Sequence, residues 1–396
     1  MRSIRVWPAL IFALACQPHS EPEGDAGMLI VDTHIDVPYR LTEKTMEDVG
    51  TRTKEGDFDH PRAVAGGLDV AFMSIYIPAK YQETGGARPF ADELIDLVEG
   101  IVDRHPDKFS LVTQIDQARL EALDGKVGLA LGMENGAPIE GDLANLAHFH
   151  GRGIRYITLT HSENNHICDS SYADERQWNG LSPFGREVVA EMNRLGIMID
   201  VSHVSDDTFF QVIELSQAPV IASHSSCRRF TPEWERNMSD EMIRLLGEKG
   251  GVIQINFGSA FLTREAQEQS SAYWAAREAF QKSGDLDDDD PALEAFGKQY
   301  WQEHRRIYAD LSDVLAHIDH VVDLAGIDHV GLGSDFDGVG DSLPTGLKDV
   351  SDYPNLSNAL LDKGHSRSDV EKILSGNILR VWSEVDGVAR RLQSAP

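Results

Sequence analysis

Histidine and carboxylate side chains recur in this sequence directly after short apolar runs. The first example is VDTHID, in which His34 and Asp36 follow the apolar residues 28–31. The run predicts a buried strand, and residues two apart in an extended chain point to the same side. His34 and Asp36 can therefore face one metal ion, and zinc accepts this pair of nitrogen and oxygen ligands. A single His-x-Asp is also common in solvated turns, so the interpretation depends on the other runs.

The elements that must position such residues are predicted from the same periodicity. After the first run, apolar segments typical of buried strands lie at residues 68–78, 127–133, 154–160, 197–201, 219–223, 251–257 and 329–333. Segments with helical periodicity separate them, among them 91–103, 142–150, 183–195, 206–216, 238–249 and 366–392. Eight buried strands that alternate with helices predict an α/β fold, a (β/α)8 TIM barrel. The helix-rich residues 265–325 form an elaboration between strands seven and eight.

The carboxyl ends of the strands carry the active site in such a barrel. Further candidates follow the third, fourth, fifth, sixth and eighth apolar runs, and they are Glu134, His161, His203, His224 and Asp335. One histidine at a strand end usually caps a loop, but all of these converge on one rim. Together with His34 and Asp36 they contain the ligand types of a two-metal site in which one carboxylate bridges both ions.

The composition of the chain indicates which partners and which domain organisation to expect. The chain has 396 residues, of which 41% are hydrophobic, and 36 Lys and Arg against 65 Asp and Glu give a net charge of −29. Such a charge disfavours nucleic acid and anionic lipid as partners. No linker divides residues 28–396, which we expect to form a single domain. Cys168 and Cys227 can form one disulfide, but nothing in their spacing demands it.

The N-terminus has the features of a targeting segment. Arg2 and Arg5 precede the apolar residues 6–15, and the small residues of ALAC end at Cys16. Residues 1–16 resemble a bacterial lipoprotein signal, after which Cys16 would carry the lipid, and 17–27 would be a tether. This predicts an extracytoplasmic protein, anchored in the periplasm or at the cell surface. An ordinary cleaved signal and a buried N-terminal helix are the alternatives.

Longer stretches of the chain resemble one known family. They are VDTHIDVPYR, LGMENGAPI, YITLTHSENN, GLSPFGREVVAEMNRLGIMIDVSHVS, PVIASHSSCR, WERNMSDE, GLGSDFDGV and GNILRV. In this order and spacing they are similar to the renal dipeptidase, or membrane dipeptidase, family of zinc metallopeptidases, in its bacterial branch. The resemblance spans nearly all of the chain after residue 27. It implies a barrel of the metal-dependent hydrolase type and a zinc dipeptidase with two zinc ions per chain.

The resemblance also implies a role for each site residue. His34 and Asp36 would bind one zinc, His203 and His224 the other, and Glu134 would bridge them. His161 would lie beside the scissile carbonyl, Asp335 would be the acid and base, and Arg236 would bind the free carboxylate of the substrate. Arg228 and Arg229 are competitors for that last role.

The reaction implied is hydrolysis of L-Xaa-L-Xaa dipeptides, with L-Xaa-D-Xaa dipeptides left open, by a metal-bridging hydroxide. A homodimer is also left open. Two departures from the animal members stand out, because their disulfide cysteines do not align with Cys168 or Cys227 and residues 380–396 are no hydrophobic tail.

Two other functions stay open at the level of the sequence. One is a two-metal hydrolase of another amide or of a lactam, since related barrels open lactams, cleave phosphoesters or deaminate bases. The other is a surface-anchored binding protein that has lost activity, against which the complete set of five ligand residues argues.

Overall fold

A sheet of parallel strands forms the centre of the molecule in the computed structural model, which describes residues 27–118, 125–287 and 290–394. The strands are β1 (Val31–Ile35), β2 (Val70–Tyr76), β3 (Phe109–Leu111), β4 (Val127–Glu134), β5 (Ile154–Thr158), β6 (Met198–Asp200), β7 (Ile221–Ser225), β8 (Val252–Ile255) and β9 (Val330–Leu332). Their order is β1-β2-β4-β5-β6-β7-β8-β9, and β3 pairs with the beginning of β4.

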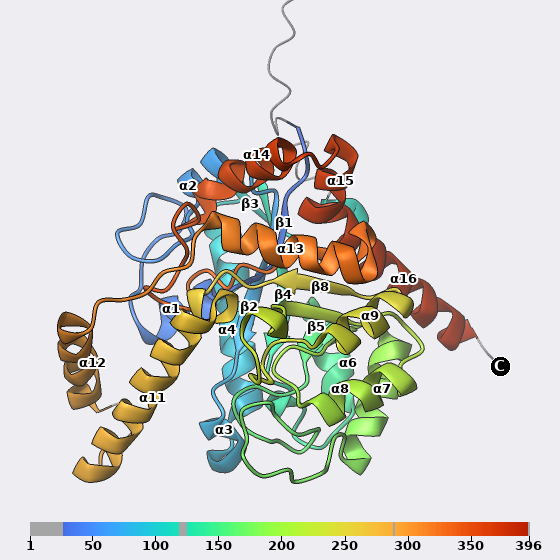
Figure 1. Ribbon diagram of the computed structural model, residues 1–396. Coiled ribbons are helices and arrows are strands. Elements are labelled where there is room, and N and C mark those ends of the chain that lie inside the picture. Colours follow the sequence, from blue (N-terminus) through green and yellow to red (C-terminus); the bar gives the residue numbers. More distant parts are fainter. Residues whose placement is uncertain (1–26, 119–124, 288–289, 395–396) are drawn as a thin grey trace, which may run out of the picture.

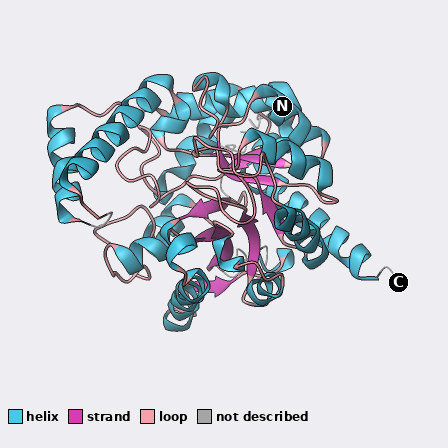
Figure 2. Ribbon diagram, turned by 90° about the horizontal axis from the view of Figure 1, so that it is seen from below, coloured by secondary structure: helices cyan, strands magenta, loops and turns pink. Residues whose placement is uncertain are grey.

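The sheet closes on itself just beyond β9. The backbone N–H of Asp36 donates to Phe336 O at 2.9 Å, and the N–H of Asp335 donates to His34 O at 3.0 Å. Eight parallel strands therefore form a nearly closed barrel, as the sequence predicted. Seen from below, the strands gather at the centre and helices surround them (Figure 2).

The helices cover the outside of the barrel (Figure 1). They are α1 (Val37–Glu43), α2 (His60–Gly66), α3 (Lys80–Thr84), α4 (Ala87–Arg104), α6 (Ala144–Gly151), α7 (Pro183–Leu195), α8 (Asp206–Leu215), α9 (Asp240–Glu248), α10 (Ser259–Leu262), α11 (Arg264–Gly284), α12 (Pro291–Glu303), α13 (Leu311–Ala325), α14 (Tyr353–Lys363), α15 (Arg367–Glu371) and α16 (Asn377–Ser394). A π-helical segment, Lys372–Gly376, joins α15 to α16.

Strand alternation explains why the barrel is apolar at one end and polar at the other. On β2, Val70 and Phe72 belong to an apolar cluster, whereas Ser74, two residues further on, donates to Glu134. Because side chains two apart share a face, one inward row runs from the core to the site. From α16, Trp382 packs against Phe72 with ring centroids 5.6 Å apart and so closes the apolar end.

Several predicted elements are confirmed almost to the residue. Helix α7 has the predicted bounds, the predicted N-cap Ser182, which accepts from Gly185 N, and the predicted stop at Gly196. The first strand differs, because it spans Val31–Ile35 rather than 28–31, so His34 lies within the strand instead of beyond it. Strand β3 was not predicted, since three residues give too short an alternation to detect.

The predicted elaboration between the last two strands contains an arm formed by α11 and α12. The two helices lie together and project from one side of the barrel (Figure 1). Few of their residues are buried: Ala266 on α11, and Leu293 and Gly297 on α12.

Some predictions concern the termini and the cysteines. The predicted signal, residues 1–16 with Cys16, and residues 17–26 of the predicted tether lie outside the described residues. Cys168 and Cys227 are buried and free, so they do not form the disulfide that the sequence left open. Within the described ranges, no helix combines the length and the apolar character that crossing a membrane requires.

Candidate metal centre and substrate cleft

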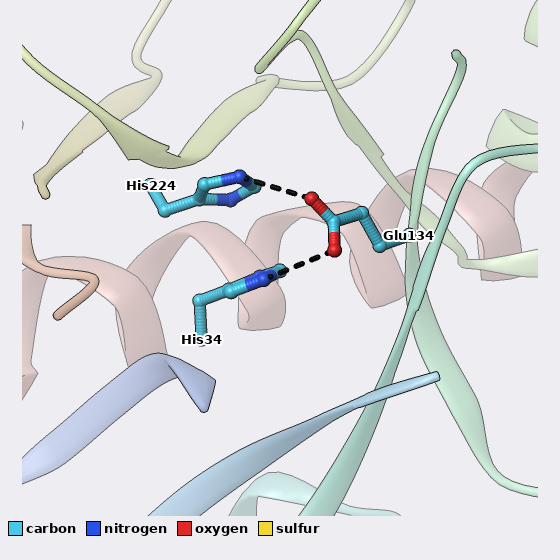
Figure 3. Close-up of side chains that lie close together, drawn as sticks. All are labelled: His34, Glu134 and His224. Carbon is cyan, nitrogen blue, oxygen red and sulfur yellow. Dashed lines mark ion pairs between the residues drawn. The ribbon is translucent and has the colours of Figure 1, made fainter. Parts of the chain in front are cut away.

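Glu134, the last residue of β4, lies at the centre of the polar end of the barrel. Its Oε1 is 3.1 Å from His203 Nε2 and 3.2 Å from His224 Nε2, and its Oε2 is 3.4 Å from His34 Nε2. Figure 3 shows the stacked rings of His34 and His224 on the same side of the carboxylate, each facing a different oxygen. One carboxylate therefore presents its two oxygens to two sets of imidazoles.

Two further carboxylates, those of Asp36 and Asp335, extend the cluster. Asp36 follows β1, and its Oδ2 is 3.4 Å from His34 Nε2. Three overlapping groups of ligand atoms each lie within 4.8 Å of one another: His34, Glu134 and His224; Glu134, His161 and His203; and His34, Asp36 and Asp335. All seven rim residues named from the sequence thus meet in one place.

The distances between these atoms do not by themselves show which residues would bind the same metal ion. His203 Nε2 and His224 Nε2 lie 2.8 Å apart, close enough to share one ion, which is the pairing implied by the family resemblance. His161 is also near, with its Nε2 3.5 Å from Glu134 Oε1 and its ring 4.2 Å from that of His203.

Further hydrogen bonds orient the imidazoles. The Nδ1 of His34 lies 2.8 Å from Tyr156 OH, and the Nδ1 of His224 lies 2.8 Å from Ser223 Oγ, which donates to Asp200. Partners of this kind leave each Nε2 facing the cluster, as in many metal sites. Gly132 makes room for this arrangement, because a Cβ there would lie 2.0 Å from the ring of Tyr156.

Burial and charge set the protonation of the cluster. Burial, Arg236 and neighbouring histidines hold the pKa of His203 well below its usual range, and burial and His34 do the same for His224. Burial alone would raise the pKa of Glu134, but His34, His161 and hydrogen bonds from the other imidazoles lower it well below 4.5. At neutral pH Glu134 is therefore a carboxylate and His203 and His224 are neutral imidazoles, the forms that bind metals. His34 differs: burial lowers its pKa, but the neighbouring Tyr156, Glu134 and Asp36 raise it well above 6.5.

The pKa of Asp335 is shifted in the opposite direction to that of Glu134. Burial and the neighbouring Asp36 raise the pKa of the Asp335 carboxyl well above its usual value. Its Oδ2 accepts a hydrogen bond from Asn256 Nδ2 at 2.7 Å. A carboxylate whose pKa is raised is a stronger base, so it is suited to take up a proton and return it in general acid and base chemistry.

The backbone at the rim adopts conformations that are uncommon for residues with a Cβ. His203 has φ 68° and Asp335 has φ 63°, both in the left-handed region. Such strain is typical of sites where the surrounding fold fixes a side chain for function. Gly338 is required next to Asp335, since a Cβ there would lie 2.1 Å from its Oδ1 and 2.3 Å from Asp36 Oδ2.

Arg236 is the one of the three candidate arginines that reaches the cluster. Its Nη2 donates to His224 O at 2.8 Å and lies 3.0 Å from His203 Nε2, and its guanidinium lies over the ring of Phe261. Arg228 instead forms an ion pair with Asp206 at 2.6 Å, and Arg229 is exposed.

The residues present fit a metal. His34 Nε2 is buried and, among the described residues, has no hydrogen-bond partner, although it faces two carboxylates. An orphaned imidazole nitrogen in such surroundings is costly without a ligand. Imidazole nitrogens and carboxylate oxygens are the ligand types that zinc takes in hydrolases.

Sequence reasoning missed the residues that support the cluster from behind. Tyr156 and Asn256 both lie inside predicted apolar runs, 154–160 and 251–257, and each reaches the site only through the register of neighbouring strands. The signal that could have found Asn256 is its polar side chain near the end of a run that is otherwise largely apolar.

A nearly closed parallel barrel with imidazoles and carboxylates on its carboxyl-terminal rim defines a metal-dependent hydrolase. The chain belongs to the membrane dipeptidase family, peptidase family M19, whose profile matches residues 26–396. It is thus a hydrolase of a metallopeptidase family that acts on dipeptides, and the predicted fold and family are confirmed.

Individual relatives agree with this assignment. An uncharacterized dipeptidase of Schizosaccharomyces pombe is 33% identical over 390 residues, covering 92% of this chain and 82% of the relative. The crystal structure of the probable dipeptidase PvdM from Pseudomonas aeruginosa has a TM-score of 0.78 at 29% identity and covers 92% of this chain and 97% of that one. A metallopeptidase from Rhodobacter sphaeroides, liganded with a phosphinate mimic of L-Ala-D-Ala, has a TM-score of 0.73 at 26% identity, covering 90% and 99%.

Proposed function

We propose that the chain is a two-zinc dipeptidase in which Glu134 bridges the metals. His34 and Asp36 would hold one ion, and His203 and His224 the other. The observation that carries the proposal is the position of the Glu134 carboxylate, with Oε2 toward His34 and Oε1 toward His203 and His224, all within 3.4 Å. When bound, the two ions would supply an activated water at neutral pH and polarise the peptide carbonyl.

The protein's own groups would complete the reaction. Asp335 would take a proton from the attacking water and deliver it to the leaving amine. His161, at the mouth of the cluster, would donate a hydrogen bond to the carbonyl oxygen as negative charge develops there. The contact of Asn256 with Asp335 Oδ2 would hold the carboxyl in one orientation for this proton transfer.

Arg236 would bind the free carboxylate of the substrate and so restrict the substrate to dipeptide length. Its guanidinium is buried, and its Nε has no hydrogen-bond partner among the described residues. An arginine that pairs with a carboxylate favours a substrate whose carboxyl terminus lies one residue from the scissile bond, because longer peptides have no charge there.

Both stereochemical classes of dipeptide are included in the proposal. The Rhodobacter sphaeroides relative was solved with a mimic of L-Ala-D-Ala, and this chain shares its fold over 90% of its length. We therefore propose that this chain hydrolyses L-Xaa-D-Xaa dipeptides as well as L-Xaa-L-Xaa dipeptides.

The variant Glu134→Gln tests the bridging assignment. We expect at least a roughly 100-fold loss of dipeptide hydrolysis and weaker binding of both zinc ions, since an amide is a poor bridging ligand. Turnover is measured as free amino acid release, with and without a chelator, and bound zinc by elemental analysis. Glu187→Gln, an exposed site on α7, is the control. Full activity of Glu134→Gln would refute the assignment, and equal cleavage of C-terminally amidated dipeptides would refute the role of Arg236.

We further propose that the enzyme acts outside the cytoplasm, tethered through a lipid on Cys16. The support is the sequence of residues 1–16, with its basic start, apolar middle and small residues before the cysteine. A homodimer remains part of the proposal on the strength of the family resemblance.

A further inference from the structure

The cleft above the metal centre continues outward to the arm. It has a volume of about 960 Å³, and its inner end is lined by Glu134, His161 and Asp335. Its outer end is lined by Trp274 on α11, Trp301 on α12 and Arg306, which follows α12. One continuous cavity therefore joins the hydrolytic centre to the aromatic side chains of the arm.

This cavity is larger than a dipeptide with small side chains requires. Pockets of about 300–1,000 Å³ enclose ligands of drug size, and this one lies near the upper limit. A substrate held at Glu134 and Arg236 would occupy the inner end, so the outer end is available for a bulky group attached to it.

The outer wall has the chemistry of a site for flat apolar groups. Trp274 is 58% exposed, unusual for so large an apolar side chain. The ring of Trp301 packs against Tyr273 with ring centroids 4.9 Å apart. The guanidinium of Arg306 lies over the same Trp301 ring, 3.8 Å from its centroid. Asp341 Oδ2 lies 3.4 Å from Arg306 Nε, and the stacked guanidinium and indole both line the cleft.

The packing of the core does not account for the exposed ring of Trp274, whose contacts include Tyr273 and Arg277 of its own helix. Among its described residues α11 buries only Ala266, so the exposed indole of Trp274 adds nothing to the core. Phe280, on the same helix, provides a comparison: it is 37% exposed, stacks on Phe296 of α12 and does not line the cleft. Trp274 is thus a ring that faces the cleft, whereas Phe280 is a ring that holds the arm together.

We propose that Trp274, Trp301 and Arg306 form an outer subsite that binds a large aromatic side chain of the substrate. The inference rests on the proposed dipeptidase function and adds a preference for dipeptides with one bulky planar residue. A substrate group is favoured over a protein partner because the wall belongs to the same cavity as the metal centre.

Substrate selectivity of Trp274→Ala tests the subsite. The zinc-loaded protein is assayed with L-Ala-L-Ala, L-Ala-L-Trp and L-Trp-L-Ala. We expect kcat/KM for at least one of the tryptophan dipeptides to fall roughly three- to tenfold, through KM, because an aromatic contact of this kind is lost. Hydrolysis of L-Ala-L-Ala should not change. Phe280→Ala should leave the ratio of aromatic to small substrates as in the wild type.

Other results would overturn the proposal. An equal loss on all three dipeptides would mean that Trp274 only supports the structure. A loss accompanied by dissociation of an oligomer in sedimentation would identify the wall as a contact between copies of the chain. If the wild type cleaves no dipeptide, the proposed function fails, and the subsite is then tested by binding alone. Calorimetry measures the affinity of the protein for reduced CH2–NH analogues of L-Ala-L-Ala, L-Ala-L-Trp and L-Trp-L-Ala. Equal affinity of the wild type and Trp274→Ala for the tryptophan analogues would refute it.

Discussion

At the scale of the residue, the orientation of Asp335 depends on one amide. Asn256 donates from Nδ2 to Asp335 Oδ2 at 2.7 Å, while its own Oδ1 accepts from Gly258 N at 2.7 Å. The second contact fixes which way the amide faces, so the donor must point to Asp335. Asn256 is therefore a positioning residue for the proposed acid and base.

Asn256→Ala should lower kcat about tenfold or more while KM and bound zinc stay near the wild-type values. Loss of the contact lets Asp335 rotate, and small misplacements of a catalytic group are costly. Steady-state kinetics and elemental analysis measure the two quantities. Asn256→Asp should be worse, because a second carboxylate would face Asp335. A wild-type kcat in Asn256→Ala, or loss of zinc in parallel with kcat, would contradict a positioning role.

At this scale, the pattern of strand ends predicted which residues meet at the rim, and the family resemblance added Arg236, which reaches them. His34, Glu134 and His224 were identified because a parallel barrel brings the carboxyl ends of all its strands to one rim. Tyr156 and Gly132 were not, since each is one residue of an apolar run. Their contact depends on the register of β4 and β5, in which Gly132 lies opposite Tyr156. That register is a tertiary property that no local pattern encodes.

At the scale of the element, long periodic segments were predictable and short or exposed ones were not. Helix α7 has both a side-chain cap and a glycine stop, so its bounds were predicted. The predicted helix 366–392 is instead α15, a π-helical segment and α16, because one extra residue per turn at Lys372–Gly376 leaves the apolar pattern nearly unchanged. The contribution of α11 to the cleft was missed, since its function lies in exposed rather than buried residues.

The start of β2 supplies a test of stability against pH. Asp69 accepts a hydrogen bond from Ile30 N at 2.8 Å, and burial raises the pKa of its carboxyl to about 6. Because the folded-state pKa lies above the ordinary 3.8, ionisation costs more in the folded state than in the unfolded chain. The stability that this group contributes is therefore present below pH 4 and is lost as the pH rises through about 6.

Asp69→Asn should thus be more stable than the wild type at pH 7.5, by about 1–2 kcal/mol once partial solvent screening is allowed for. The advantage should shrink at pH 5, because the wild-type carboxyl is then largely protonated. Denaturant unfolding at the two pH values measures the difference in free energy. Asp174→Asn, at an exposed position, should show no such change. An advantage of Asp69→Asn that is equal at both pH values would contradict the argument.

At the scale of the whole molecule, the parallel barrel separates the proposed anchor from the cleft. Strand β1 begins at Val31, at the amino end of the barrel, whereas Glu134 and the other rim residues lie at the carboxyl ends of the strands. A chain that enters through β1 must therefore arrive at the face opposite the metal centre. From Cys16 to Gly27, the first described residue, the chain has 27 − 16 = 11 residues, which span at most about 39 Å when extended.

A lipid on Cys16 should therefore hold the protein near a membrane with its cleft facing away. We expect kcat/KM for dipeptides to be the same, within about twofold, for the anchored protein in vesicles and for a chain that lacks residues 1–16, because neither substrate access nor the rim depends on the tether. Cys16→Ser should move the protein from the membrane fraction to the soluble fraction in a bacterial host. Retention of Cys16→Ser in the membrane would argue for an uncleaved N-terminal segment, and a large loss of activity on anchoring would show that the cleft faces the lipid.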